Sequence, residues 1–288
     1  GIDDAVPMIM GANIGTTVTN ILASLGYLRR GDDFRRAFAA ATVHDIFNLL
    51  AVAVLLPVEL LTGYLSGLAG WITDLVIGSS GASFKSPLKA AVKMPAGWIK
   101  DLLSELGTHG DLKGGLMIVI GLVFIFLALA FVTKNMRLLV ANRVEAAINR
   151  TLGAGSGLVA IVLGMIITVA VQSSSITTSV LVPLAAAGVL SLENVYPVTL
   201  GANVGTTVTA LLASLATGSP AAVTVALVHT LFNLTGIALF YPVRSLRALP
   251  IRLATGLARI GAERRTWAVT YVLAMFLVIP LLGVMILR

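Results

Sequence analysis

Long runs of apolar residues constrain this chain more than any other feature of its sequence. Stretches long enough to cross a bilayer recur at 37–61, 115–133, 157–190, 195–216, 221–243 and 267–287. Runs of about 20 apolar residues are typical of transmembrane helices, which satisfy their own backbone hydrogen bonds. Only 11% of the 288 residues are charged, against about 25% in a soluble domain, which argues against two or three soluble domains. The sequence predicts an all-α, polytopic transmembrane helical bundle.

The arginine residues cluster in segments outside most of these runs, as expected for the cytoplasmic loops of a membrane protein. Thirteen of the fourteen fall in the segments 29–36, 137–150 and 244–265, which we expect to face the cytoplasm from a plasma (inner) membrane. Five of the six lysines lie in 62–114, where acidic residues balance them, so this segment is predicted to be extracytoplasmic. Orientation explains the net charge of +7, and no nucleic-acid partner is expected. The chain has no cysteine, which excludes disulfides and thiolate metal sites.

An internal repeat adds a second constraint. The run GANIGTTVTNILASL at 11–25 returns as GANVGTTVTALLASL at 201–215 with twelve of fifteen positions identical. VHDIFN at 43–48 likewise returns as VHTLFN at 228–233. The connection between the two motifs carries four arginines in the first copy and no charge in the second, so the copies can be inserted in opposite directions. We predict two inverted repeats, the architecture of secondary transporters, with a parallel duplication as the alternative.

The repeat and the loops divide the chain into five segments. These are a partial first repeat at 1–61, an extracytoplasmic loop at 62–114, a transmembrane helix with a cytoplasmic interfacial helix (134–150) at 115–155, the second repeat at 156–243, and a basic connection with a final transmembrane helix at 244–288. Residue 1 is not methionine, and residues 1–10 align with 191–200. We therefore expect residue 1 to be an internal position of a longer protein.

Polar side chains interrupt the apolar run at QSSSITTS, residues 172–179, where Gln172 and six hydroxyl residues occur within eight positions. A polar group without a hydrogen-bond partner costs several kcal/mol in hydrocarbon. This cluster is therefore expected to face protein, water or a ligand. Hydrogen bonds to the i−4 carbonyl, or between helices, are the structural alternatives. Because so many polar groups occur together, we favour a binding site.

The two glycine motifs supply further candidate ligands. A G-x-x-x-G pair alone is typical of close helix packing. Here each pair is accompanied by amide and hydroxyl side chains: Asn13, Thr16, Thr17 and Thr19 in one copy, and Asn203, Thr206, Thr207 and Thr209 in the other. Glycine also permits a helix break, which exposes carbonyls to a cation and N–H groups to an anion. Neutral oxygens suit Na⁺ rather than a transition metal, and N–H groups with hydroxyls can hold a phosphate-like anion.

One carboxylate distinguishes the two copies. Asp45 in the first copy aligns with Thr230 in the second. A carboxylate within a span is a functional candidate, here an asymmetric cation ligand. The structural alternative is a pair between Asp45 and His44 or an arginine near the interface. We interpret His44 and His229, which occur in both copies, as structural hydrogen-bonding groups.

The motifs GANIGTTVTN, QSSSITTSVLVPL and YPVTLGANVGTT together resemble those of the type II sodium–phosphate cotransporters, including bacterial members. The resemblance implies two inverted repeats with broken helices or re-entrant hairpins, each with a QSSS segment. It also implies alternating access that couples phosphate uptake to Na⁺, with no cofactor beyond that ion. The first QSSS segment would lie upstream of Gly1.

The resemblance also implies roles for individual residues. A sodium ion is expected to be bound by Gln172, Thr206, Thr209 and Thr16. Phosphate is expected to be held by Ser173 and Ser174, to which we add Ser175, Asn203 and Asn13 as candidates. Asp45 matches the aspartate that the family associates with an additional sodium ion and with electrogenic transport.

The predicted function is therefore Na⁺-dependent import of inorganic phosphate across a lipid bilayer, by a protein that is not an enzyme. A phosphate exporter of the related bacterial branch is the alternative within the same class. An intramembrane hydrolase that uses Ser173–Ser175 with a histidine is the alternative from another class, but no G-x-S-x-G elbow surrounds these serines. No Walker motif is present, so ATP-driven transport within this chain is not expected. The sequence leaves the oligomeric state open.

Overall fold

A computed structural model describes residues 2–77, 87–107, 110–121, 123, 124, 127 and 157–286. Every element within these ranges is helical, which confirms the predicted all-α class. In chain order the elements are α1 (Ile2–Gly15), α2 (Val18–Leu25), α3 (Gly31–Thr62), α4 (Tyr64–Ile77), α5 (Pro87–Glu105), α7 (Gly157–Val171), α8 (Ser174–Ala186), α9 (Leu192–Thr217), α10 (Pro220–Phe240), α11 (Arg244–Glu263), α12 (Arg265–Leu273), the π-helical η1 (Ala274–Val278) and α13 (Ile279–Ile286).

Four of the described helical segments are long and apolar enough to cross a membrane: Ala5–Leu25, Gly31–Thr62, Leu192–Thr217 and Pro220–Phe240. The first of them, α1 with α2, was missed as a span because its threonines and asparagines lower its mean hydropathy to 1.2. The apolar run 157–190 is not one span but two short helices, α7 and α8, which meet at Gln172 and Ser173. The helix predicted at 134–150 lies outside the described residues.

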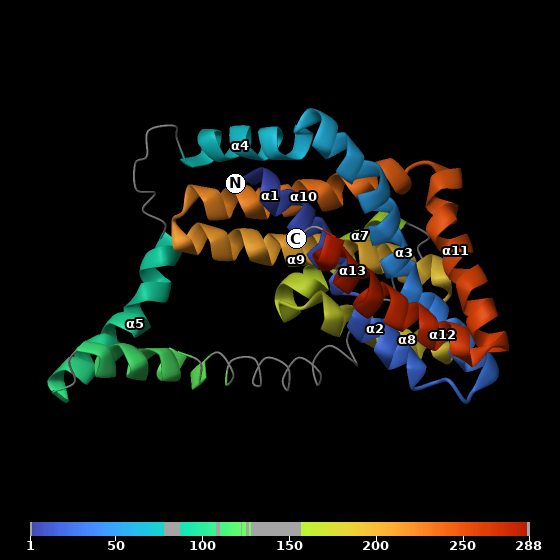
Figure 1. The fold of residues 1–288 in the computed structure, drawn as a ribbon, viewed down its shortest axis with the longest axis horizontal. Helices are drawn as coiled ribbons and strands as arrows, with labels where there is room; N and C mark the ends of the chain where they lie inside the picture. The colour runs from blue at the N-terminus through green and yellow to red at the C-terminus, as the bar shows by residue number, and fades with distance from the viewer. Residues whose placement is uncertain are drawn as a thin grey trace.

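Helices α9 and α10 lie side by side in the bundle, with α1 and α4 packed on α10 and α7 packed along α9 (Figure 1). Helix α3 packs on α8 and α9 and is covered by α11. Helix α5 stands to one side and contacts α9 (Figure 1). The segment 62–114, which we expected to be a loop, therefore contributes a packed helix, α4. The basic connection predicted from residue 244 onward is likewise a helix, α11.

The hydrophobic core is shared between the two sequence copies. Phe47 of the first copy packs edge-on against Tyr196 and Phe240, with ring centroids 6.0 Å apart in both pairs. A Cβ atom at Gly236 would lie 3.3 Å from the Phe47 ring, a tight contact that places the two copies close together at this point. These two ring contacts join the copies across the core.

The turn between α3 and α4 uses a buried carboxylate for a structural purpose. Gly63 ends α3 with a φ of +60°, a left-handed conformation that glycine adopts without strain. The Glu59 carboxylate then accepts hydrogen bonds from the backbone N–H groups of Leu65 (2.6 Å) and Ser66 (3.0 Å) at the start of α4. Negative charge at a helix N-terminus is favourable, so Glu59 is explained without a role in binding.

Candidate functional site

Two helix interruptions lie next to each other in the structure. Helix α1 ends at Gly15 and α2 begins at Val18, while α7 ends at Val171 and α8 begins at Ser174. The hydroxyl of Ser175 lies 3.5 Å from the backbone oxygen of Thr16, and so joins the second interruption to the first. Residues from both sequence copies are thus brought to one place, although 159 positions separate them.

The interruption at the QSSS segment has an unusual backbone. Gln172 adopts a φ of +56°, which non-glycine residues rarely do, and its side chain is exposed. Ser173 caps α8, because its hydroxyl accepts a hydrogen bond from the backbone N–H of Ile176 at 3.3 Å. Ser174 and Ser175 occupy the first turn of α8, where backbone N–H groups lack partners within the helix. Such a terminus, flanked by hydroxyls, is suited to an anion.

The other hydroxyls of this segment are occupied by structural hydrogen bonds. Thr177 accepts a hydrogen bond from the Thr168 hydroxyl (2.9 Å), and Thr178 donates to the backbone oxygen of Ser174 (2.7 Å). The buried Asn20 of α2 donates to Thr178 (2.6 Å) and accepts from Ser179 (3.1 Å). The cluster therefore divides: residues 172–175 lie at the interruption, while 177–179 hold α8 against its neighbours.

The asparagines of the glycine motifs pair across the two copies. Asn13 donates to the Asn233 side chain at 2.8 Å, and Asn203 donates to the Asn48 side chain at 2.8 Å. The histidines repeat this exchange: His44 lies 2.5 Å from Asn203, and His229 lies 3.4 Å from Asn13. Both histidines thus take part in hydrogen bonds, as we interpreted from the sequence. Each copy contacts the other through the same positions, as a twofold relation requires.

The candidate threonines donate to backbone oxygens three or four residues earlier in the chain. The acceptors are the carbonyls of Asn13 for Thr16 (2.8 Å), of Ala202 for Thr206 (3.1 Å), and of Thr206 (2.8 Å) and Gly205 (3.0 Å) for Thr209. A hydroxyl that donates its only hydrogen keeps its lone pairs available to a cation. All three side chains are only partly buried.

The second glycine motif does not break its helix. Helix α9 runs without interruption through Gly201 and Gly205, in contrast to the break that we considered possible there. A Cβ atom at Gly201 would overlap the backbone oxygen of Ile161 on α7, and one at Gly205 would lie 2.6 Å from the Thr168 Cβ. These glycines let α7 approach α9 closely, so in this copy the motif serves packing.

Asp45 is fully buried on α3 between two hydroxyl groups. Thr17, at the α1–α2 interruption, lies 2.9 Å from one carboxylate oxygen, and the Tyr271 hydroxyl donates to the other. Within the described residues Asp45 forms no ion pair with an arginine, and the hydrogen bond of His44 goes to Asn203. Among the described residues, Asp45 therefore pairs neither with His44 nor with an arginine, the two structural alternatives considered from the sequence. Tyr271 lies on α12 just before the π-helical η1, an irregularity often found at functional sites.

A family model and the curated relatives that match this chain all carry descriptions of sodium–phosphate transport. The family model for Na⁺/Pi-cotransporters matches residues 123–261. Sodium-dependent phosphate transport protein 2A of Rattus norvegicus is 36% identical over 97% of this chain and 54% of its own length. The 2B protein of Bos taurus is 32% identical over 96% and 52%. The chain is thus similar to members of the Na⁺/Pi-cotransporter family over most of its length. It spans about half the length of these curated relatives, and no solved structure matches it significantly.

The residues singled out from the sequence occupy four places. Gln172, Ser173, Ser174, Ser175 and Thr16 lie at the neighbouring interruptions; Thr206 and Thr209 lie on the continuous helix α9; Asn13 and Asn203 lie in the paired amides; and Asp45 lies between Thr17 and Tyr271. The roles of Asn20 and Tyr271 emerge only from the structure. In the sequence, each is marked only by being a polar residue within a largely apolar segment. Within the described ranges, no three His, Asp or Glu side chains gather as they would around a transition metal.

Proposed function

We propose that this chain forms part of a secondary active transporter that moves inorganic phosphate into the cell together with Na⁺. The observation that supports this most is the meeting of the QSSS interruption with the α1–α2 interruption at Ser175 and Thr16. Oxygen-rich helix breaks in a membrane bundle are the usual sites of ion and substrate binding in such transporters. The curated relatives are named for sodium-dependent phosphate transport.

Phosphate would bind at the N-terminus of α8. Its oxygens would accept hydrogen bonds from the first-turn N–H groups and from the hydroxyls of Ser173, Ser174 and Ser175. No arginine or lysine belongs to this segment, so binding would rest on neutral donors and permit rapid release. The Asn13 and Asn203 side chains bond to the other copy in this structure. They would therefore help phosphate binding by holding the two copies together, or by contacting phosphate in another state of the transport cycle.

Sodium would bind to neutral oxygens nearby. Thr16, Thr206 and Thr209 present hydroxyl lone pairs, and the exposed Gln172 amide supplies a further oxygen. Asp45 would bind an additional sodium ion, which its buried negative charge would attract. In this structure the hydroxyls of Thr17 and Tyr271 stabilise the carboxylate, and an arriving cation would replace the Tyr271 contact.

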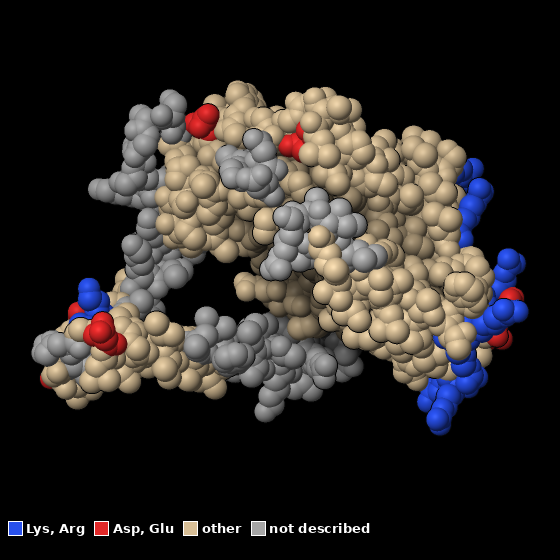
Figure 2. Space-filling view, viewed as in Figure 1, with Lys and Arg blue, Asp and Glu red and all other residues tan. Residues whose placement is uncertain are grey.

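Transport would follow from two inverted repeats that rock against each other. The reciprocal pairs Asn13–Asn233 and Asn203–Asn48 support a twofold relation between the copies. The arginine side chains gather at one end of the molecule, over α11 and the start of α3 (Figure 2). Arg29 and Arg265 line one cavity there, and Arg35 and Arg259 line another. This end would face the cytoplasm, and the arginines at 137–150 lie outside the described residues.

The function is tested by uptake of ³²P-phosphate into proteoliposomes that contain the full-length protein. We expect uptake under an inward Na⁺ gradient and little uptake when K⁺ replaces Na⁺. Ser175→Ala is expected to reduce uptake about tenfold, because one hydrogen bond to a charged ligand contributes about 1.5–3 kcal/mol. Ser214→Ala is the matched control, since among the described residues this buried hydroxyl bonds only to the backbone oxygen of Leu211. Equal uptake in Na⁺ and K⁺ would overturn the proposal.

A further inference from the structure

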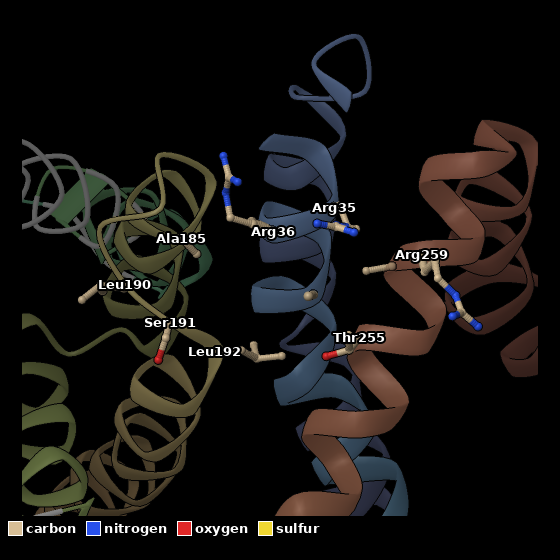
Figure 3. A pocket seen from close by; sticks show the side chains of 10 residues that line it. Arg35, Arg36, Ala185, Leu190, Ser191, Leu192, Thr255 and Arg259 are labelled. Carbon is tan, nitrogen blue, oxygen red and sulfur yellow. The ribbon is translucent and has the colours of Figure 1, made fainter. Parts of the chain in front are cut away.

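A cavity of about 330 Å³ lies at the arginine-rich end of the molecule, apart from the residues assigned to transport. Figure 3 shows it between α3, the turn from α8 into α9, and α11. Its polar lining comes from Arg35 and Arg36 of α3, Ser191 before α9, and Thr255 and Arg259 of α11. Alanine and leucine side chains make up the rest of the lining. The cavity thus combines an apolar wall with cations contributed by two helices.

The arginines of this cavity are only partly neutralised. The guanidinium of Arg36 is fixed, because it donates to the backbone oxygen of Ala186 and to Asp33, both at 2.8 Å. Arg35 is 3.4 Å from Asp32, and both side chains are at least half exposed, so this pair contributes little and can exchange. Arg259 forms no ion pair within the described part of the chain.

The side chains that could close on a ligand lie on opposite walls. In Figure 3 the guanidinium of Arg35 lies between α3 and α11, whereas that of Arg259 turns outward from α11. Arginine side chains are long and flexible, so a change of rotamer can carry Arg259 toward an anion held by Arg35. The planar guanidinium matches the oxygens of a phosphate group, to which it can donate two parallel hydrogen bonds.

We propose that this cavity binds the phosphate group of an anionic ligand, at a site separate from the transport pathway. Two sources share this chemistry: the headgroup of an anionic membrane phospholipid, and free inorganic phosphate. Basic pockets between helices at the cytoplasmic side of membrane proteins suit lipid headgroups, and the apolar wall here suits the glycerol and first acyl carbons. The bound group would link α3 to α11 and stabilise the bundle.

The test compares the thermal stability of the full-length protein in nanodiscs under two conditions. One arm adds phosphatidylglycerol to phosphatidylcholine nanodiscs, and the other adds inorganic phosphate to phosphatidylcholine nanodiscs alone. Arg35→Gln/Arg259→Gln removes two cavity charges. Arg244→Gln/Arg252→Gln removes two exposed charges from the same end of the molecule, outside this cavity. Stabilisation by phosphate at the transport site would be common to all variants and cancels in the comparison.

We expect the ligand to raise the Tm of the wild-type and control proteins equally, and the cavity variant to lose most of that rise. A loss confined to the phosphatidylglycerol arm assigns a lipid headgroup, and a loss confined to the phosphate arm assigns the free ion. Equal responses of cavity variant and wild type in both arms would overturn the proposal, as would an equal loss in the control. If the double variant fails to fold, Arg259→Gln carries the same test, because this side chain makes no ion pair among the described residues.

Discussion

The two copies of the glycine motif share twelve of fifteen residues, and the structure uses them differently. In the second copy, α7 packs so closely on α9 that Gly201 and Gly205 leave no room for a Cβ atom, and the helix is continuous. In the first copy nothing among the described residues lies within 4 Å of a Cβ atom at Gly11 or Gly15, and the helix is interrupted. Nearly identical sequence therefore takes the conformation that its packing partner selects.

Glycine replacements should give the largest difference between the copies. Gly201→Ala places a methyl group against the backbone of α7, and we expect it to lower stability by about 3 kcal/mol. Gly11→Ala in this chain should be neutral or stabilising by up to about 1 kcal/mol, because alanine favours helix. Thermal unfolding in detergent measures both. Equal destabilisation at both positions in this chain would contradict the comparison, whereas a cost at Gly11 only in a longer protein would identify an upstream segment that covers α1.

The copies also differ in charge at Asp45 and Thr230. Asp45→Thr gives the first copy the residue of the second and removes the buried carboxylate. If Asp45 serves a sodium ion, this variant should lose one Na⁺ from the transport stoichiometry, read as a lower Hill coefficient and less current per phosphate. Tyr271→Phe should have a smaller effect and raise Na⁺ affinity about tenfold, because the cation no longer has to replace a hydrogen bond to the carboxylate.

Thr230→Ala is the control for this pair of variants, since within the part of the chain that the structure describes its hydroxyl bonds only to the backbone oxygen of Ala226. Unchanged stoichiometry in Asp45→Thr would remove Asp45 from the sodium sites and leave it a structural role with Thr17 and Tyr271.

A third difference between the copies is Asn20, which corresponds to Ala210. Asn20→Ala makes the first copy resemble the second and leaves Thr178 and Ser179 without their amide partner. We expect a loss of about 1–3 kcal/mol in stability, because buried polar groups lose a hydrogen bond without gaining water. The reverse change, Ala210→Asn, should have a smaller effect, since Ala210 is only partly buried and an added amide can be hydrated there. Thermal unfolding compares the two, and a neutral Asn20→Ala would show that α8 is held by other contacts.

The sequence was enough to predict the helical class, to identify the internal repeat and to single out the polar QSSS segment as a candidate site. Each of these rests on local composition or on self-similarity. It could not predict that Asn13 pairs with Asn233, since an amide within a helix gives no indication of which helix will face it. The contact between Asp45 and Tyr271 joins positions 226 residues apart and depends on how α12 docks. The different conformations of Thr16 and Thr206 were equally out of reach, because the local sequences are the same and only the packed neighbour differs.

Cysteine labelling should have the smallest effect on stability, since Arg29 is exposed and Ser219→Cys removes only the side-chain cap of α10, worth about 1 kcal/mol. The two connections at issue follow α2 and α9, and if the copies are inverted these connections lie on opposite sides of the membrane. Arg29→Cys is on an exposed arginine-rich turn, and Ser219→Cys is in the uncharged turn before α10. The chain has no native cysteine, so each variant carries a single thiol. We expect a membrane-impermeant maleimide added outside intact cells to label Ser219→Cys and spare Arg29→Cys until the membrane is opened. Labelling of both from one side would favour a parallel duplication, and the reciprocal amide pairs would then reflect a twofold axis along the membrane normal.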